Sequence, residues 1–126
     1  MKILLTVTAL LEAGAGLALL GIPSAMATLL LGAPLETPAS LTVARVGGGG
    51  LLALAIACWM ARDDSQSRAA RGLFVAMLVY NLAAVATLAF ASIALKLRGA
   101  GLWPAVILHA IMGVWCVACL VKKAVR

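Results

Sequence analysis

Residues 72–95 read GLFVAMLVYNLAAVATLAFASIAL and contain no charged side chain. A helix needs about 20 apolar residues to cross the roughly 30 Å of hydrocarbon in a bilayer, and this stretch is long enough. Three further stretches hold at most one charged residue each, at about 3–22, 41–61 and 102–121. We therefore predict an all-α integral membrane protein, in which residues 1–126 form a single four-span domain with an antiparallel, up-down four-helix bundle.

The overall composition points the same way. Apolar residues make up 65% of the chain and charged residues 11%, which is typical of a bilayer protein. The net charge of +6 does not indicate a nucleic-acid surface, because the basic residues stand at the ends of apolar segments and do not form one solvated face. The sequence thus predicts the lipid bilayer as a partner and no nucleic acid.

The segment after the first span is predicted to be a short helix. Pro23 ends the first span, because proline lacks an N–H group and clashes with the preceding turn. The apolar residues Ser24 to Gly32 are too few to cross the bilayer, so we expect them to lie in its outer interface. The remaining connections are expected at 33–40, 62–71 and 96–101.

The first span has a rival interpretation as a cleavable signal peptide. Ala25-Met26-Ala27 has the small-x-small form of a cleavage site. Glu12 lies inside the preceding apolar stretch, and the apolar run continues beyond the site. Both features favour a first span that is kept in the protein.

Basic residues in the flanks predict the orientation. If the amino terminus is cytoplasmic, seven Lys and Arg residues lie inside and three outside. The inner group is Lys2, Arg62, Arg68, Arg71, Lys122, Lys123 and Arg126, and the outer group is Arg45, Lys96 and Arg98. Because cytoplasmic flanks carry the excess of positive charge, we predict a multi-pass protein of a bacterial inner membrane with both ends of the chain in the cytoplasm.

Four polar residues stand inside the predicted spans: Glu12, Arg45, Asn81 and His109. Small residues surround them at helical spacing, so we expect these side chains to face other helices. Arg45 lies about 9 Å from the middle of its span, close enough for an extended side chain to pair with Glu12. Ionisable groups inside a membrane mark a functional site by default, and we predict that the four bind a ligand.

The same residues also have a purely structural interpretation. Inter-helix hydrogen bonds and ion pairs can simply determine which helices pack together. For Asn81 considered alone, this structural role is the favoured interpretation. Tyr80 and Trp115 are interpreted as core or lipid-facing aromatics. If the site is functional, Glu12 and His109 suit the proton-coupled movement or binding of a small amphipathic molecule.

The cysteines form a weaker candidate site. Cys116 and Cys119 have C-x-x-C spacing, and Cys58 is predicted at a matching depth in the second span. Redox or metal chemistry is possible for such a group, but cysteines in apolar helices usually pack as small hydrophobic residues. No phosphate loop, serine nucleophile elbow or H-E-x-x-H motif is present in the sequence. We predict no catalytic residue, metal or cofactor.

Parts of the sequence resemble two groups of membrane proteins. Leu11-Glu12-Ala13-Gly14 resembles the first span of the small multidrug resistance transporters, which implies substrate and proton binding at Glu12. The resemblance covers one helix. More broadly, the chain looks like small uncharacterised bacterial four-helix membrane proteins of the DoxX-like group. The residues that carry this resemblance are Ala44-Arg45-Val46-Gly47, Tyr80-Asn81, and Trp103-Pro104 with the later His109. This second resemblance implies a fold and no particular activity.

Three functions are compatible with these features. The favoured one is a module that binds or moves a small amphipathic or lipid-like molecule. The second is a non-catalytic accessory or scaffold subunit, either in a homo-oligomer or in a larger membrane complex. The third is a membrane enzyme of the redox or isomerase type that uses His109 or the cysteines.

Overall fold

The computed structural model describes residues 1–124, which form five helices and no strand. The helices are α1 (Lys2–Gly21), α2 (Pro23–Leu31), α3 (Pro38–Ala61), α4 (Arg68–Ile93) and α5 (Leu102–Ala124). Four of them, all except α2, are long and apolar enough to cross a membrane. The predicted number of long apolar helices, four, is therefore confirmed. The side chains of Lys122, Lys123 and Arg126, which entered the charge count, lie outside the described part.

Two helices begin earlier than predicted, because each has a cap just before it. Thr37 accepts a hydrogen bond from the backbone N–H of Ser40 over 3.1 Å, and Pro38 opens α3 at a position where a missing N–H is harmless. Ser67 caps α4 in the same way, through the N–H of Ala70 at 3.1 Å. The predicted loops at 33–40 and 62–71 are therefore too long at their carboxyl-terminal ends.

The carboxyl end of α4 also differs from the prediction. The helix ends at Ile93, two residues before the predicted Leu95. Lys96 adopts a left-handed conformation with φ 57°, and the N–H of Leu97 donates to the carbonyl of Ala91 over 3.1 Å. This reversal stops the helix and turns the chain toward α5.

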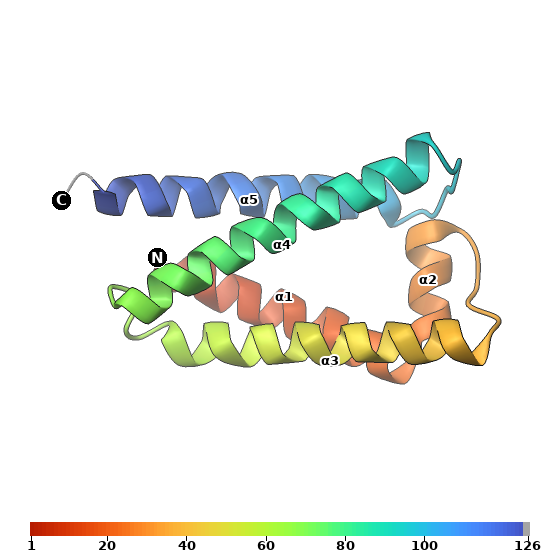
Figure 1. Ribbon diagram of the computed structural model, residues 1–126, viewed down its shortest axis with the longest axis horizontal. Helices are drawn as coiled ribbons and strands as arrows, with labels where there is room; N and C mark the ends of the chain where they lie inside the picture. Colours follow the sequence, from red (N-terminus) through yellow and green to blue (C-terminus); the bar gives the residue numbers. More distant parts are fainter. Residues whose placement is uncertain (125–126) are drawn as a thin grey trace.

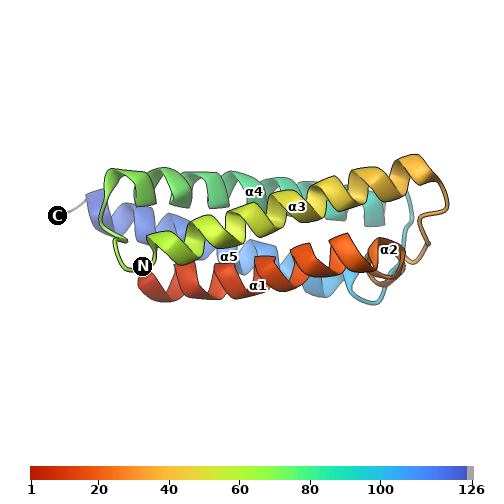
Figure 2. The same ribbon diagram turned by 90° about the horizontal axis from the view of Figure 1, so that it is seen from below.

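The four long helices alternate in direction, so that α1 begins and α5 ends at the same end of the bundle (Figure 1). α2 lies across the opposite end (Figure 1). The closest helix pairs are α1 with α3 and α4 with α5, whereas α3 touches α4 much less. Figure 2 shows α1 and α3 running side by side. Among the sequential spans, the first pairs closely with the second and the third with the fourth, whereas the second and third, α3 and α4, touch only weakly.

Glycine allows α1 and α3 to approach so closely. A Cβ atom on Gly48 would lie 2.8 Å from the carbonyl oxygen of Gly16, and one on Gly16 would lie 2.8 Å from that of Gly48. Neighbouring Gly47, Gly49 and Gly50 face open space. Within the run of four glycines, only Gly48 is required for backbone contact.

The apolar core lies at the end where α1 begins. Its buried members come from α1, α3, α4 and α5 and are Leu4, Leu5, Ala9, Cys58, Ala70, Phe74, Met77, Met112, Cys116 and Cys119. An ion pair between the Lys2 ammonium and the Asp63 carboxylate, at 2.6 Å, joins the start of α1 to the connection between α3 and α4 at this end.

α2 is attached to the connection between α4 and α5. Gly99 packs against the backbone of Leu29 and Leu30, where a Cβ atom would not fit. The N–H of Gly101 donates to the carbonyl of Leu29 over 2.8 Å. The predicted short helix after the first span is thus present, and it packs on another part of the chain.

Candidate functional site

Glu12 lies on the inner face of α1. Its side chain is 6% exposed, although it is one of only four acidic residues in the chain. The hydroxyl of Tyr80 on α4 donates to the Oε2 atom of Glu12 over 3.2 Å. A carboxyl group in hydrocarbon needs such a partner, because removing it from water is expensive. This hydrogen bond links the α1–α3 pair to the α4–α5 pair.

Asn81 and His109 form the second polar contact. The Nδ1 atom of His109 on α5 lies 2.9 Å from the Oδ1 atom of Asn81. The Nδ2 atom of Asn81 donates to the carbonyl of Met77 over 2.7 Å, which orients the amide with its oxygen toward the histidine. A neutral His109 must then carry its proton on Nδ1, and this leaves Nε2 as a hydrogen-bond acceptor.

The two polar contacts meet at Tyr80 and His109. The rings pack edge to face, with centroids 5.4 Å apart and planes at 86°. Glu12, Tyr80, His109 and Asn81 therefore form a continuous polar cluster across three helices. We call these four side chains the polar cluster.

A cavity of about 330 Å³ adjoins the polar cluster. Glu12, Tyr80 and His109 contribute its polar surface, and the rest of its lining is Leu11, Gly14, Ala15, Ala18, Met26 and Leu108. Leu11 on α1 and Leu108 on α5 are 38% and 39% exposed, so the cavity reaches the molecular surface between these two helices. Both residues lie in helices that are long and apolar enough to cross a membrane.

A second cavity, of about 350 Å³, lies beside the Asn81–His109 contact. Except for these two residues its lining is apolar, and it comes from α4 and α5 with Gly113 among the lining residues. His109 borders both cavities. The Asn81–His109 hydrogen bond thus stands between two spaces.

Arg45 is separate from the polar cluster. Its side chain is exposed, and its Nε atom donates to the carbonyl of Leu20 in the last turn of α1 over 3.3 Å. The carbonyls at a helix end have no partner within the helix, and a cation there is favourable. Among the described residues the ion pairs are Lys2 with Asp63 and Arg62 with Asp63, so the expected pairing of Arg45 with Glu12 does not form.

The register of α1 against α3 explains why. The helices are antiparallel with Gly16 opposite Gly48, which places Arg45 level with the end of α1 and Glu12 level with the residues after Gly48. The eight residues from Glu12 to Leu20 span about 12 Å of helix, which an arginine side chain does not bridge from its position here.

The three cysteines are free and buried in the core. The Sγ atom of Cys58 lies 3.7 Å from the Sδ atom of Met77. No group of three or more His, Cys, Asp or Glu side chains that could hold a metal occurs within the described chain. Redox chemistry of the cysteines stays a prediction without structural support.

Tyr80 is the member of the polar cluster that the sequence did not single out. It was interpreted as a packing aromatic, yet its hydroxyl contacts Glu12 and its ring contacts His109. A signal was present: Tyr80 lies next to Asn81, and it is the only tyrosine in a chain with four polar residues singled out inside its predicted spans. A lone phenol in such a chain is a natural hydrogen-bond donor for a buried carboxylate.

Comparisons with protein-family models, with curated proteins and with solved structures found no match to this chain.

Proposed function

We propose that this membrane protein binds a small amphipathic molecule in the cavity beside Glu12, Tyr80 and His109, and that proton exchange at Glu12 and His109 accompanies its binding or movement. The observation that supports this proposal is the shared cavity. Glu12 and His109 line one space of about 330 Å³, which is within the range of small-molecule sites. Its mainly apolar walls suit the apolar part of an amphipathic ligand, and Glu12 suits a cationic or hydrogen-bond-donating head.

The proposed setting is a bacterial inner membrane with both ends of the chain in the cytoplasm. The basic flanks favour this orientation, seven residues against three. α2 would then lie along the outer interface, across the ends of the long helices. An amphipathic molecule dissolved in the bilayer could reach the cavity sideways between α1 and α5.

The direct test is binding of tetraphenylphosphonium, a lipophilic cation, to the purified protein in detergent. Glu12→Gln keeps the shape of the side chain and an acceptor for Tyr80 while removing the charge. We expect it to weaken binding by about tenfold or more, which corresponds to about 1.4 kcal/mol. Glu36→Gln is the matched control, because Glu36 is exposed in the connection between α2 and α3. Equal binding by the two variants, or no saturable binding by the unmodified protein, would contradict the proposal.

A scaffold function is the second candidate, and one observation favours it. The Tyr80–Glu12 hydrogen bond joins α1 to α4, and the His109–Asn81 contact joins α4 to α5, as side chains that organise helix packing would. In that case Glu12→Gln lowers thermal stability or disrupts the assembly of a complex but leaves no ligand affinity to change. Measuring unfolding and cation binding on the same samples separates the two functions.

A further inference from the structure

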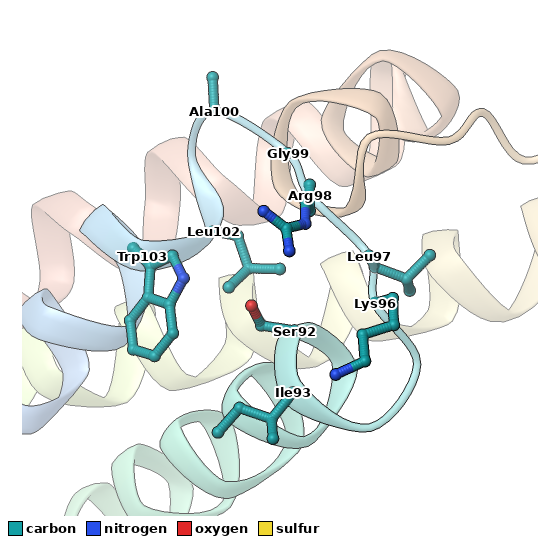
Figure 3. A pocket seen from close by; sticks show the side chains of 9 residues that line it. All are labelled: Ser92, Ile93, Lys96, Leu97, Arg98, Gly99, Ala100, Leu102 and Trp103. Carbon is teal, nitrogen blue, oxygen red and sulfur yellow. The ribbon is translucent and has the colours of Figure 1, made fainter.

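A cavity of about 660 Å³ lies at the end of the bundle where α4 ends and α5 begins. It is distinct from the cavity beside the polar cluster. Figure 3 shows its lining: Ser92, Ile93, Lys96, Leu97, Arg98, Gly99, Ala100, Leu102 and Trp103. The guanidinium of Arg98 extends from the connection into the space between the last turn of α4 and Trp103, and the side chain of Lys96 runs beside that turn (Figure 3).

The polar groups of this cavity are hydrogen-bond donors. Lys96 and Arg98 bring two positive charges, Ser92 a hydroxyl and Trp103 an indole N–H. The lining contains no carboxylate, and neither cation takes part in the ion pairs that the structure describes. Two unpaired cations beside further donors match a group with several acceptor oxygens and negative charge.

The walls of the cavity are held in place by backbone contacts. Gly99 packs on the backbone of α2, and the N–H of Gly101 donates to Leu29 over 2.8 Å. The αL glycine Gly32 approaches the carbonyl of Arg98, where an added Cβ atom would be 2.7 Å away. The connection that carries both cations is thus supported by α2, and a ligand would not have to order it.

The position of the cavity narrows the ligand class. Trp103 is the second residue of an apolar span and is half exposed, as tryptophans at a membrane interface are. Basic side chains just outside a span meet lipid headgroups, and their attraction to anionic lipids is substantial. We propose that this cavity binds a phosphate group, which either an anionic phospholipid headgroup or free phosphate can supply.

The experiment compares two variants that remove the cations. Lys96→Gly removes a charge at a position with φ 57°, where glycine is less strained, so this variant is expected to fold. Arg98→Gln removes the charge and keeps a shorter polar side chain. Binding of dioleoylphosphatidylglycerol, with dioleoylphosphatidylcholine for comparison, is followed by native mass spectrometry, and inorganic phosphate is titrated calorimetrically. We expect each variant to weaken binding about fivefold.

The matched controls are Arg68→Gln and Arg71→Gln, which remove exposed cations at the other end of α4. Weaker lipid or phosphate binding by Lys96→Gly and Arg98→Gln, with unchanged binding by the two controls, supports the proposed phosphate site. If these variants weaken the binding of phosphatidylglycerol, the phosphate group comes from a lipid headgroup. If they weaken only the binding of inorganic phosphate, it comes from a soluble source. Equal losses in all four variants, or no binding that depends on Lys96 and Arg98, would overturn the proposal. Glu12→Gln is expected to leave this binding unchanged, so the outcome is independent of the function proposed above.

Discussion

At the scale of single residues, the buried Glu12 carboxyl is paired with Tyr80. The Tyr80 hydroxyl is the one side-chain donor to the Glu12 carboxyl within the described chain. We expect Tyr80→Phe to destabilise the protein by about 0.6–2 kcal/mol, the range for hydrogen bonds between membrane helices. A double-mutant cycle of Tyr80→Phe with Glu12→Ala, which removes the acceptor, should show coupling, because the two side chains are in contact. Strictly additive effects in thermal unfolding would show that the hydrogen bond contributes nothing.

Asp63 gives a second prediction at this scale, one that depends on pH. The hydrogen bond from Lys2 lowers the pKa of the Asp63 carboxyl below its ordinary value of 3.8. A group with a lowered pKa in the folded state stabilises the fold above its unfolded pKa, and the effect is lost as the pH falls through the folded value. We expect the small difference in melting temperature between the protein and Asp63→Asn to be present at pH 7 and to vanish in strong acid. A difference that grows on acidification would contradict the pairing.

The residues of the candidate site show what sequence can and cannot predict. Glu12, Asn81 and His109 were identified because polar groups are rare inside apolar spans, and the structure brings all three into the polar cluster. Arg45 was identified by the same argument, but its partner depends on how far α3 is shifted along α1. No periodic pattern specifies that shift, so its contact with Leu20 could not be predicted.

At the scale of helices, the contact between α1 and α3 depends on Gly16 and Gly48. We expect Gly48→Ala to destabilise this pair by about 1–3 kcal/mol, because the new methyl group would meet the backbone of α1. Gly49→Ala is the matched control, since its Cβ atom faces open space and alanine favours a helix. The buried cysteines make the measurement simple, because a thiol-reactive dye reports unfolding when they become exposed. Equal stability of the two variants would argue against the close approach.

The starts of two helices could be predicted from the sequence, but the end of α4 could not. The caps Thr37 and Ser67 are of residue types that mark helix starts, so α3 and α4 could have been placed earlier from the sequence. The end of α4 is different, because Lys96 adopts a left-handed conformation that normally favours glycine. The contacts of the connection with α2 lie far away in the sequence, and they could not be read from local pattern.

At the scale of the whole molecule, the proposed orientation makes a clear prediction. Glu36→Cys and Asp64→Cys place thiols in the connections at opposite ends of the bundle. With both termini in the cytoplasm, a membrane-impermeant maleimide should label the first variant in intact spheroplasts and the second only after lysis. The unmodified protein is the control, since its own cysteines are buried. The reverse labelling pattern would show that the protein has the opposite orientation, with both termini outside.

The distribution of exposed side chains fits a molecule surrounded by hydrocarbon. Many large apolar residues on the four long helices are exposed, among them Val46, Val79 and Val114, each more than 60% exposed. Trp59 and Trp103 stand near opposite ends of the bundle and are both half exposed, as interfacial tryptophans are. The four spans were predictable because this apolar character is continuous along the sequence, whereas the pairing of the helices depends on a few small residues.

The surroundings of Leu108, at the mouth of the cavity between α1 and α5, decide whether this cavity lies in the membrane. A nitroxide spin label attached to Leu108→Cys in reconstituted vesicles reports its contact with oxygen, which concentrates in hydrocarbon, and with a water-soluble nickel complex. We predict high accessibility to oxygen and low accessibility to nickel at Leu108, with the opposite pattern at Asp64→Cys. Accessibility to nickel at Leu108 matching that at Asp64 would place the cavity in water and contradict a membrane-embedded binding site.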